Sequence, residues 1–186
     1  MRISETIEAP NMGMRLTCRE STPTLKFDLW MRADAAPIPM HVHPHQEERV
    51  TVVRGSVRSR TGKVDRVLEP DDVVVSPAGD AHTVGPAGDE EVEMLAELSP
   101  ALGYEQFMER SFALDHAGYV NKKGRGNPLR LATAKPHKAE FFVAGVPPAV
   151  QRALLTAVDP GWTARVQQAC LTPPRPGRRR ERRIRT

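Results

Sequence analysis

Short runs of alternating apolar and polar residues dominate the first hundred positions of the chain. Two β-prone runs are GMRLTCRE (13–20) and TLKFDLWMRAD (24–34), and VTVVRG, SVRSR, KVDRVLEP, DVVVSP and EVEMLAELSP follow them. Glycine, proline or aspartate bounds each run, and the runs recur at intervals of roughly 8–12 residues. Because this pattern is typical of an antiparallel sandwich or barrel, residues 1–100 are predicted to form a mainly β body.

Helical spacing replaces this pattern beyond Pro100. Apolar residues recur at near-helical intervals at Leu102, Tyr104, Phe107, Met108 and Phe112, and again at Val150, Leu154, Ala157 and Val158. Pro147-Pro148 is a favourable start for the second helix, a shorter helix is expected over 164–171, and FFVAG (141–145) reads as a strand. The apolar stripes are too short for a core of their own, so residues 101–172 are predicted to be a helical extension packed on the barrel.

Composition fits one soluble globular domain with a basic tail. Apolar residues make up 39% of the 186 positions and charged residues 27%. The formal net charge is +4, but residues 175–186 hold seven arginines and one glutamate, so the remainder carries −2. Residues 173–186 are therefore predicted to be a disordered arginine-rich tail. We do not expect this tail to bind nucleic acid, because no aromatic residue or groove-reading motif accompanies it.

Targeting and cysteine patterns add two expectations. No apolar stretch approaches the roughly 20 residues of a membrane span, and MRISETIEAP lacks the apolar centre of a secretory signal. We therefore expect a cytoplasmic protein with no membrane partner. Cys18 and Cys170 form no CxxC pattern, so they are interpreted as buried or half-buried thiols.

Metal-binding residue types gather in HVHPHQEERVTVVRG (41–55). Residues two apart on a strand share a face, so His41 and His43 can present both imidazoles to one interior point. A tight connection then brings a carboxylate at Glu48 back beside them, and His82 follows a Pro/Gly turn where another strand begins. Three imidazoles and one carboxylate predict a site for one divalent transition metal: iron, manganese, nickel, zinc or cobalt.

These segments resemble the cupin superfamily, in particular its small single-domain barrels. The two cupin motifs read G-x5-H-x-H-x3–4-E-x6-G and G-x5-P-x-G-x2-H-x3-N, and this chain gives His41-x-His43-x4-Glu48-x6-Gly55 and Pro77-x-Gly79-x2-His82. Ala35 and Asp71 replace the opening glycines and Pro86 replaces the asparagine, which puts loop geometry in question but not the ligands. The resemblance covers about residues 24–100.

The cupin resemblance implies an antiparallel double-stranded β-helix, or jelly-roll barrel, and a homodimer. It also implies the metal ligands His41, His43, Glu48 and His82. Two neighbours compete with them. His45 lies in the turn and is expected to face solvent, although a one-residue slip of the strand would make it a ligand. Glu47 also fits the motif, but the count of six residues to Gly55 favours Glu48. His116 and His137, in the helical part, are interpreted as surface or capping residues.

Strand alternation also predicts the pocket wall. Counting from Glu48 places Val50 and Val52 inward, and Val84 follows His82 in the same way. The wall would be largely aliphatic and no inward cluster of arginine or lysine is apparent, which favours a small, partly apolar organic substrate over a phosphorylated sugar.

Three classes of function follow from this site. The first is a metal-dependent, dioxygenase-like oxygenase, which the resemblance implies because this activity is common among small cupins. The second is a non-redox isomerase, cyclase or lyase, which the absence of a separate acid or base motif disfavours. The third is a small-molecule-binding module without turnover. The catalytic residues are unknown, and residues 121–130, rich in glycine and basic side chains, are a candidate lid loop.

Overall fold

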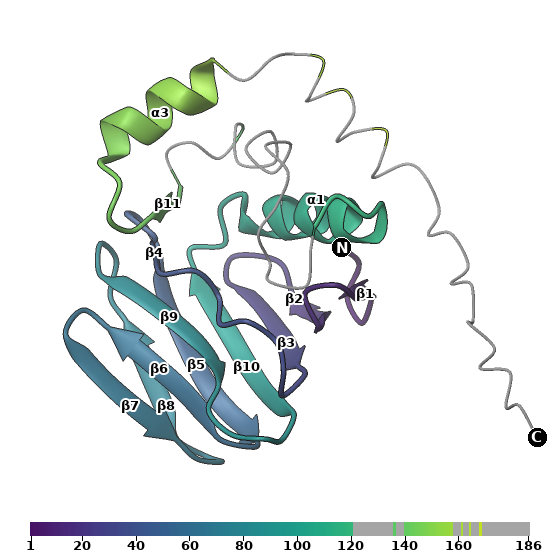
Figure 1. The fold of residues 1–186 in the computed structure, drawn as a ribbon, viewed down its shortest axis with the longest axis vertical. Coiled ribbons are helices and arrows are strands. Elements are labelled where there is room, and N and C mark those ends of the chain that lie inside the picture. Colours follow the sequence, from purple (N-terminus) through teal and green to yellow (C-terminus); the bar gives the residue numbers. More distant parts are fainter. Residues whose placement is uncertain (121–135, 137–139, 158–160, 162–163, 165–167, 169–186) are drawn as a thin grey trace, which may run out of the picture.

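Two antiparallel β-sheets face each other and form the body of the protein (Figure 1). The computed structural model describes residues 1–120, 136, 140–157, 161, 164 and 168. The six-stranded sheet runs, in spatial order, β1 (Thr6–Ala9), β2 (Met14–Glu20), β3 (Leu25–Met31), β10 (Val92–Ser99), β5 (Glu47–Arg54) and β8 (Val73–Ser76). The five-stranded sheet runs β11 (Phe142–Val143), β4 (His41–Val42), β9 (Ala81–Pro86), β6 (Val57–Thr61) and β7 (Val64–Leu68). The predicted mainly β, jelly-roll architecture is confirmed.

Period-two alternation builds the core between the two sheets. In β3, Leu25, Phe27 and Leu29 are buried while the residues between them are partly exposed, and β10 alternates in the same way. β10 lies between β3 and β5, where Ala96 pairs with Phe27 on one side and with Val50 on the other. The buried faces of both sheets form one continuous hydrophobic cluster, so the interior is closed on these sides.

A glycine fixes the tight turn between β5 and β6. Gly55 adopts φ +73°, and a Cβ at this position would lie 2.5 Å from the carbonyl oxygen of Glu91. A side chain would therefore meet both backbone strain and a steric clash. This geometry explains in physical terms why the first motif of the sequence ends on glycine.

The first helix, α1 (Tyr104–His116), begins later than the apolar pattern predicted. Met108, Phe112 and Leu114 are buried against the hydrophobic cluster, so the helix packs on the body by this face. Leu102 lies outside it, with φ +45° and 47% of its surface exposed. Including Leu102 in the helical stripe was wrong, because the connection from β10 turns through this residue before the helix starts.

The second predicted helix, α3 (Pro148–Thr156), begins at the predicted prolines but buries a different face. Val150 and Leu154 are 48% and 54% exposed, whereas Leu155 is 5% exposed. Gln151 explains the orientation, because its side chain accepts from the Val143 N–H (3.0 Å) and donates to the Val143 carbonyl (2.8 Å). Residues 151 and 155 share a helix face, so this face turns toward β11 and the predicted stripe faces solvent.

Several predictions fall on residues outside those described: the loop 121–130, His137, Cys170, nearly all of the expected helix 164–171 and the tail 173–186. The division of the chain into barrel, extension and tail accordingly stays a prediction. Cys18 is buried, as expected. None of the helices in the described part of the chain is long and apolar enough to cross a membrane.

Candidate metal centre

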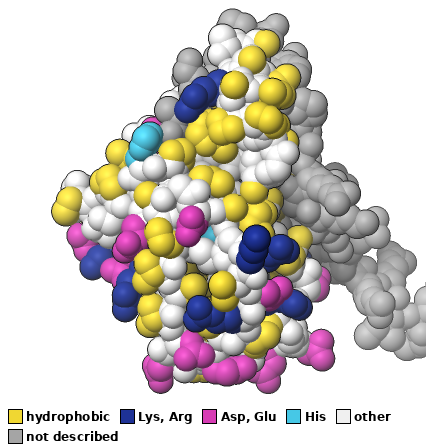
Figure 2. Space-filling model, turned by 90° about the vertical axis from the view of Figure 1, so that its left-hand side faces the viewer, with side chains coloured by type: hydrophobic (Ala, Val, Ile, Leu, Met, Phe, Trp, Pro, Cys, Tyr) yellow, Lys and Arg dark blue, Asp and Glu magenta, His cyan; other side chains and the backbone are white. Residues whose placement is uncertain are grey.

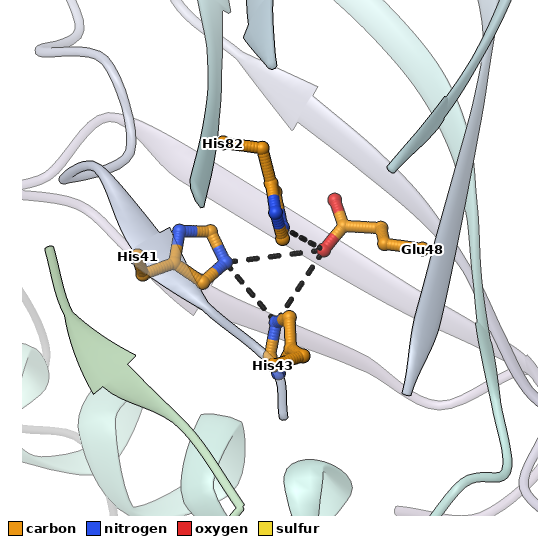
Figure 3. A group of neighbouring side chains, drawn as sticks. All are labelled: His41, His43, Glu48 and His82. Carbon is orange, nitrogen blue, oxygen red and sulfur yellow. Dashed lines mark hydrogen bonds and ion pairs between the residues drawn. The ribbon is translucent and has the colours of Figure 1, made fainter. Parts of the chain in front are cut away.

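Three strands and one turn bring the four candidate ligands together inside the barrel (Figure 3). His41 lies on β4 and His82 on β9, where the two residues are direct partners across the antiparallel pair. His43 follows β4, and Glu48 is the second residue of β5. Their exposed fractions are 6% for His41, 0% for His43, 7% for Glu48 and 2% for His82. The structure therefore buries all four residues that the sequence selected.

Their ligand atoms converge on one small volume. His41 Nε2 lies 3.1 Å from His43 Nε2, and His82 Nε2 lies 3.2 Å from Glu48 Oε2. The same carboxylate oxygen is 3.5 Å from His43 Nε2 and 3.9 Å from His41 Nε2. One potential ligand atom from each residue lies within 4.8 Å of the others. This is the spacing expected when four donors surround a single cation.

Backbone carbonyls set the tautomer of two of the imidazoles. The Nδ1–H of His41 donates to the Pro39 carbonyl (2.9 Å), and that of His82 donates to the Asp80 carbonyl (2.9 Å). When these rings are neutral, each Nε2 is left with a lone pair that points into the cluster. His43 Nε2 lies 3.1 Å from His41 Nε2, so a proton or a cation must lie between the two nitrogens, and the buried Nδ1 of His43 has no hydrogen-bond partner. The donor set therefore fits a metal ion.

The loop that carries His82 is tied to the segment that carries His43. The Gly79 N–H donates to the His43 carbonyl at 2.9 Å, and Gly79 has φ +91°, a conformation that glycine adopts without strain. The Asp80 carbonyl in the same turn orients His82. The second sequence motif thus supports the ligands through backbone hydrogen bonds as well as supplying one.

The electrostatics of the cluster favour neutral His41 beside ionised Glu48. Burial lowers the pKa of His41 from 6.5 to about 4, although the charge of Glu48 opposes this. Burial alone would raise the pKa of Glu48, but the imidazoles of His43 and His82 outweigh it and hold that pKa well below its usual range. Burial likewise lowers the pKa of His82, yet contact with the Glu48 carboxylate raises it overall. A proton on His82 occupies the position beside Glu48 that a metal cation would take.

The competing candidates face away from the cluster. His45 and Glu47 are both exposed, as predicted from the turn position of His45 and from the motif spacing for Glu47, so neither can serve as a ligand in this register. His116 is an exposed residue at the end of α1, which confirms its interpretation as a surface histidine. Val50, Val52 and Val84 are 3%, 0% and 4% exposed and point into the interior. Their role as a substrate wall stays a prediction.

Two buried neighbours of the cluster escaped the sequence reasoning. Gln46, in the turn before β5, is 1% exposed and donates to the carbonyls of Pro100 (2.8 Å) and Ala101 (3.0 Å). Tyr104 of α1 packs edge-on against His43, with ring centroids 5.0 Å apart and planes at 80°. Gln46 lies in the tight connection that the sequence predicts before Glu48, and Tyr104 lies in a predicted apolar helix stripe. Local sequence patterns do not predict these contacts, because each joins segments that are more than 50 residues apart in the chain.

The fold is a β-barrel with a buried four-residue cluster that could hold a metal ion, and a comparison with known families makes the fold assignment specific. A family model described as a cupin domain matches residues 31–96, a segment that contains all four clustered residues. Residues 31–96 therefore form a cupin domain, which covers about a third of the chain. No curated protein matches the chain in sequence.

Solved structures with a similar fold show low sequence identity. A protein with a double-stranded β-helix domain from Klebsiella pneumoniae is 19% identical, with a TM-score of 0.47, over 55% of this chain and 90% of that one. A cupin domain from Schizosaccharomyces pombe is 16% identical (TM-score 0.43; 47% of this chain, 64% of that one). A sugar phosphate isomerase of the cupin superfamily from Silicibacter pomeroyi is 18% identical (TM-score 0.43; 48% and 61%). This chain spans less than two thirds of the latter two.

Proposed function

We propose that this chain is a metal-dependent, dioxygenase-like oxygenase that acts on a small, partly apolar organic substrate. The convergence of three imidazole nitrogens and one carboxylate oxygen in the barrel interior is the main support. Four protein ligands leave about two positions of an octahedral ion for exogenous ligands. When bound, a redox-active ion such as iron supplies dioxygen activation and Lewis acidity. Iron, manganese, nickel, zinc and cobalt all suit these donors.

The residues of the chain have distinct roles in this proposal. His41, His43 and His82 hold the ion through Nε2, with the Pro39 and Asp80 carbonyls keeping two of the rings in place. The carboxylate of Glu48 offsets part of the positive charge in a site that water barely reaches.

Aliphatic side chains limit what can enter beside the ion. In this proposal the buried side chains of Val50, Val52 and Val84 line the interior beside the ligands and exclude water from it. They offer no polar partner to a sugar or a phosphate group, which is why we favour a partly apolar substrate.

Oxygen consumption with defined metals tests the proposal. Purified protein is stripped with chelator, reloaded with Fe²⁺ or Zn²⁺, and supplied with a panel of catechols and enediols in an oxygen-electrode cell. We expect substrate-dependent oxygen uptake with Fe²⁺ and none with Zn²⁺, which has no redox chemistry. The His43→Ala variant should lose both the stoichiometric ion and the uptake. The His45→Ala variant, altered at an exposed histidine two residues away, should keep both.

The alternatives give different results in the same assay. Equal turnover with both metals and no oxygen uptake would favour a non-redox isomerase, cyclase or lyase. Ligand binding without turnover would leave a binding module. Full retention of the ion by His43→Ala would refute the proposed centre itself. The homodimer stays a prediction that light scattering on the full chain would test.

A further inference from the structure

A pocket opens between the free edges of the two sheets, where β7 and β8 are the last strands. It has a volume of about 240 Å³. Figure 2 views the molecule from the side on which β7 lies in Figure 1, where charged side chains stand among exposed apolar ones. Its lining includes Ser59, Thr61, Val64, Arg66, Val74 and Asp80. The volume corresponds to roughly eight water-sized groups, enough for a small organic acid.

Strand register places this pocket beside the metal centre. In the five-stranded sheet His41, His82, Thr61 and Val64 form one row across four neighbouring strands. Paired residues in an antiparallel sheet point to the same face, and neighbouring strands are about 4.8 Å apart. The pocket wall at Thr61 therefore lies one strand from the candidate ligand His82.

The opposite sheet repeats this arrangement. Glu48 pairs with Ser76 of β8, and the Ser76 and Thr61 hydroxyls are hydrogen-bonded to each other at 3.0 Å. This hydroxyl pair joins the two sheets directly beside the contact between Glu48 and His82. The pair therefore lies between the metal centre and the pocket.

Arg66 gives the pocket a specific chemistry. It is the register partner of Ser59, whose side chain is buried, and both line the pocket. Within the part of the chain that the structure describes, Arg66 has no ion-pair partner, whereas Arg58 on the outer face pairs with Asp65 at 3.0 Å. A guanidinium with free donors matches a carboxylate in a bidentate geometry. The sequence pattern predicts no inward basic cluster, and Arg66, an exposed residue that lines this pocket, leaves that prediction unchanged.

Asp80 restricts what else the ligand can carry. Its exposed side chain lines the same pocket. A second anionic group near Asp80 would be repelled, so the pocket disfavours dicarboxylates and phosphate esters. A single carboxylate at Arg66, with a neutral or cationic remainder, fits both charges.

We propose that this pocket binds the carboxylate end of a small monocarboxylic acid through Arg66, and that the rest of the molecule reaches past the Thr61 and Ser76 hydroxyls toward the metal. The second part of this inference, that the ligand reaches the metal, rests on the proposed function. Carboxylate binding at Arg66 can be measured without turnover.

Ligand-observed NMR titration of zinc-loaded protein with benzoate and with the neutral isostere benzamide tests the inference. We expect benzoate to bind the unmodified chain about tenfold more tightly than benzamide, because the charge-assisted pair is available only to the acid. The R66Q variant should lose this preference while keeping its zinc content and thermal midpoint. The matched variant R60Q removes the same charge from the exposed outer face of β6 and should behave like the unmodified chain.

A second variant gives an effect of the opposite sign. D80N removes a negative charge from the pocket and retains the backbone carbonyl that orients His82, so benzoate should bind more tightly. Equal benzoate affinity in R66Q and the unmodified chain would overturn the inference, as would a lack of preference over benzamide. These results are distinct from failure of the proposed function, which would show as absent metal or absent oxygen uptake in a protein that still prefers benzoate.

Discussion

Acidification of the metal-free protein should expose the energetic consequence of burying His41. The folded-state pKa of His41 is about 4 against 6.5 when unfolded, and burial is the largest cause. The unfolded chain therefore takes up a proton that the folded chain refuses, so stability falls as pH drops from about 6.5 and the loss is complete near pH 4. Since one pH unit corresponds to 1.36 kcal/mol, the loss due to this residue is roughly 3 kcal/mol.

Glu48 and His82 also make the stability of the metal-free protein depend on pH, but with the opposite sign or in a different pH range. The pKa of Glu48 is lowered, so its contribution is present above its unfolded value of 4.5 and is lost as pH falls below it. The pKa of His82 is raised, so its contribution is full below 6.5 and is lost as pH rises through its folded value. Between pH 6.5 and 4.5 the effect of His41 therefore stands nearly alone.

Urea denaturation of chelator-treated protein at several pH values from 7.5 to 4 measures this loss against the H41N variant. Asparagine can still donate to the Pro39 carbonyl but has no titratable nitrogen, so its stability should decline by about 3 kcal/mol less over the same range. Parallel declines in the two proteins would refute the reasoning, since His41 would then be equally easy to protonate in the folded and unfolded states.

Three further predictions concern packing around the centre. Gly85→Ala places a Cβ 2.7 Å from the Cα of Pro37, so a loss of about 1–3 kcal/mol in urea denaturation is expected, with Gly88→Ala in open space as the control. Gln46→Leu leaves the buried Ala101 carbonyl and the partly buried Pro100 carbonyl without their donor, and the unfolding free energy should fall by about 1–3 kcal/mol at unchanged metal stoichiometry. Tyr104→Leu removes an edge-on ring contact from a ligand, so the Kd for Co²⁺ should rise about three- to tenfold, whereas Tyr104→Phe should leave it unchanged.

Strand periodicity and motif spacing were enough to predict the barrel and the cluster. Alternation forces residues two apart onto one face, so His41 and His43 had to share a direction once they lay in extended chain. The count to Gly55 chose Glu48 over Glu47, and burial of the first with exposure of the second agrees with it. These features are local, which is why sequence reasoning reached them.

Features that depend on contacts between distant segments were not predicted. Helical spacing showed that Val150 and Leu154 share a face but carried no information on whether that face meets the protein or the solvent. The hydrogen bonds between Gln151 and Val143 decide this. Arg66 lies at an alternating position of an edge strand, and only the register with Ser59 shows that it lines a pocket.

The backbone bond from Gly79 to His43 affects how selectively the centre can take up ions. It ties two loops that would otherwise have to be ordered by the incoming cation, so little conformational entropy remains to be lost at that moment. A preorganised site of this kind discriminates among ions by size and preferred geometry, because rearranging it around a poorly fitting ion costs free energy. Loosening this tie should broaden the range of metals accepted and weaken the hold on each.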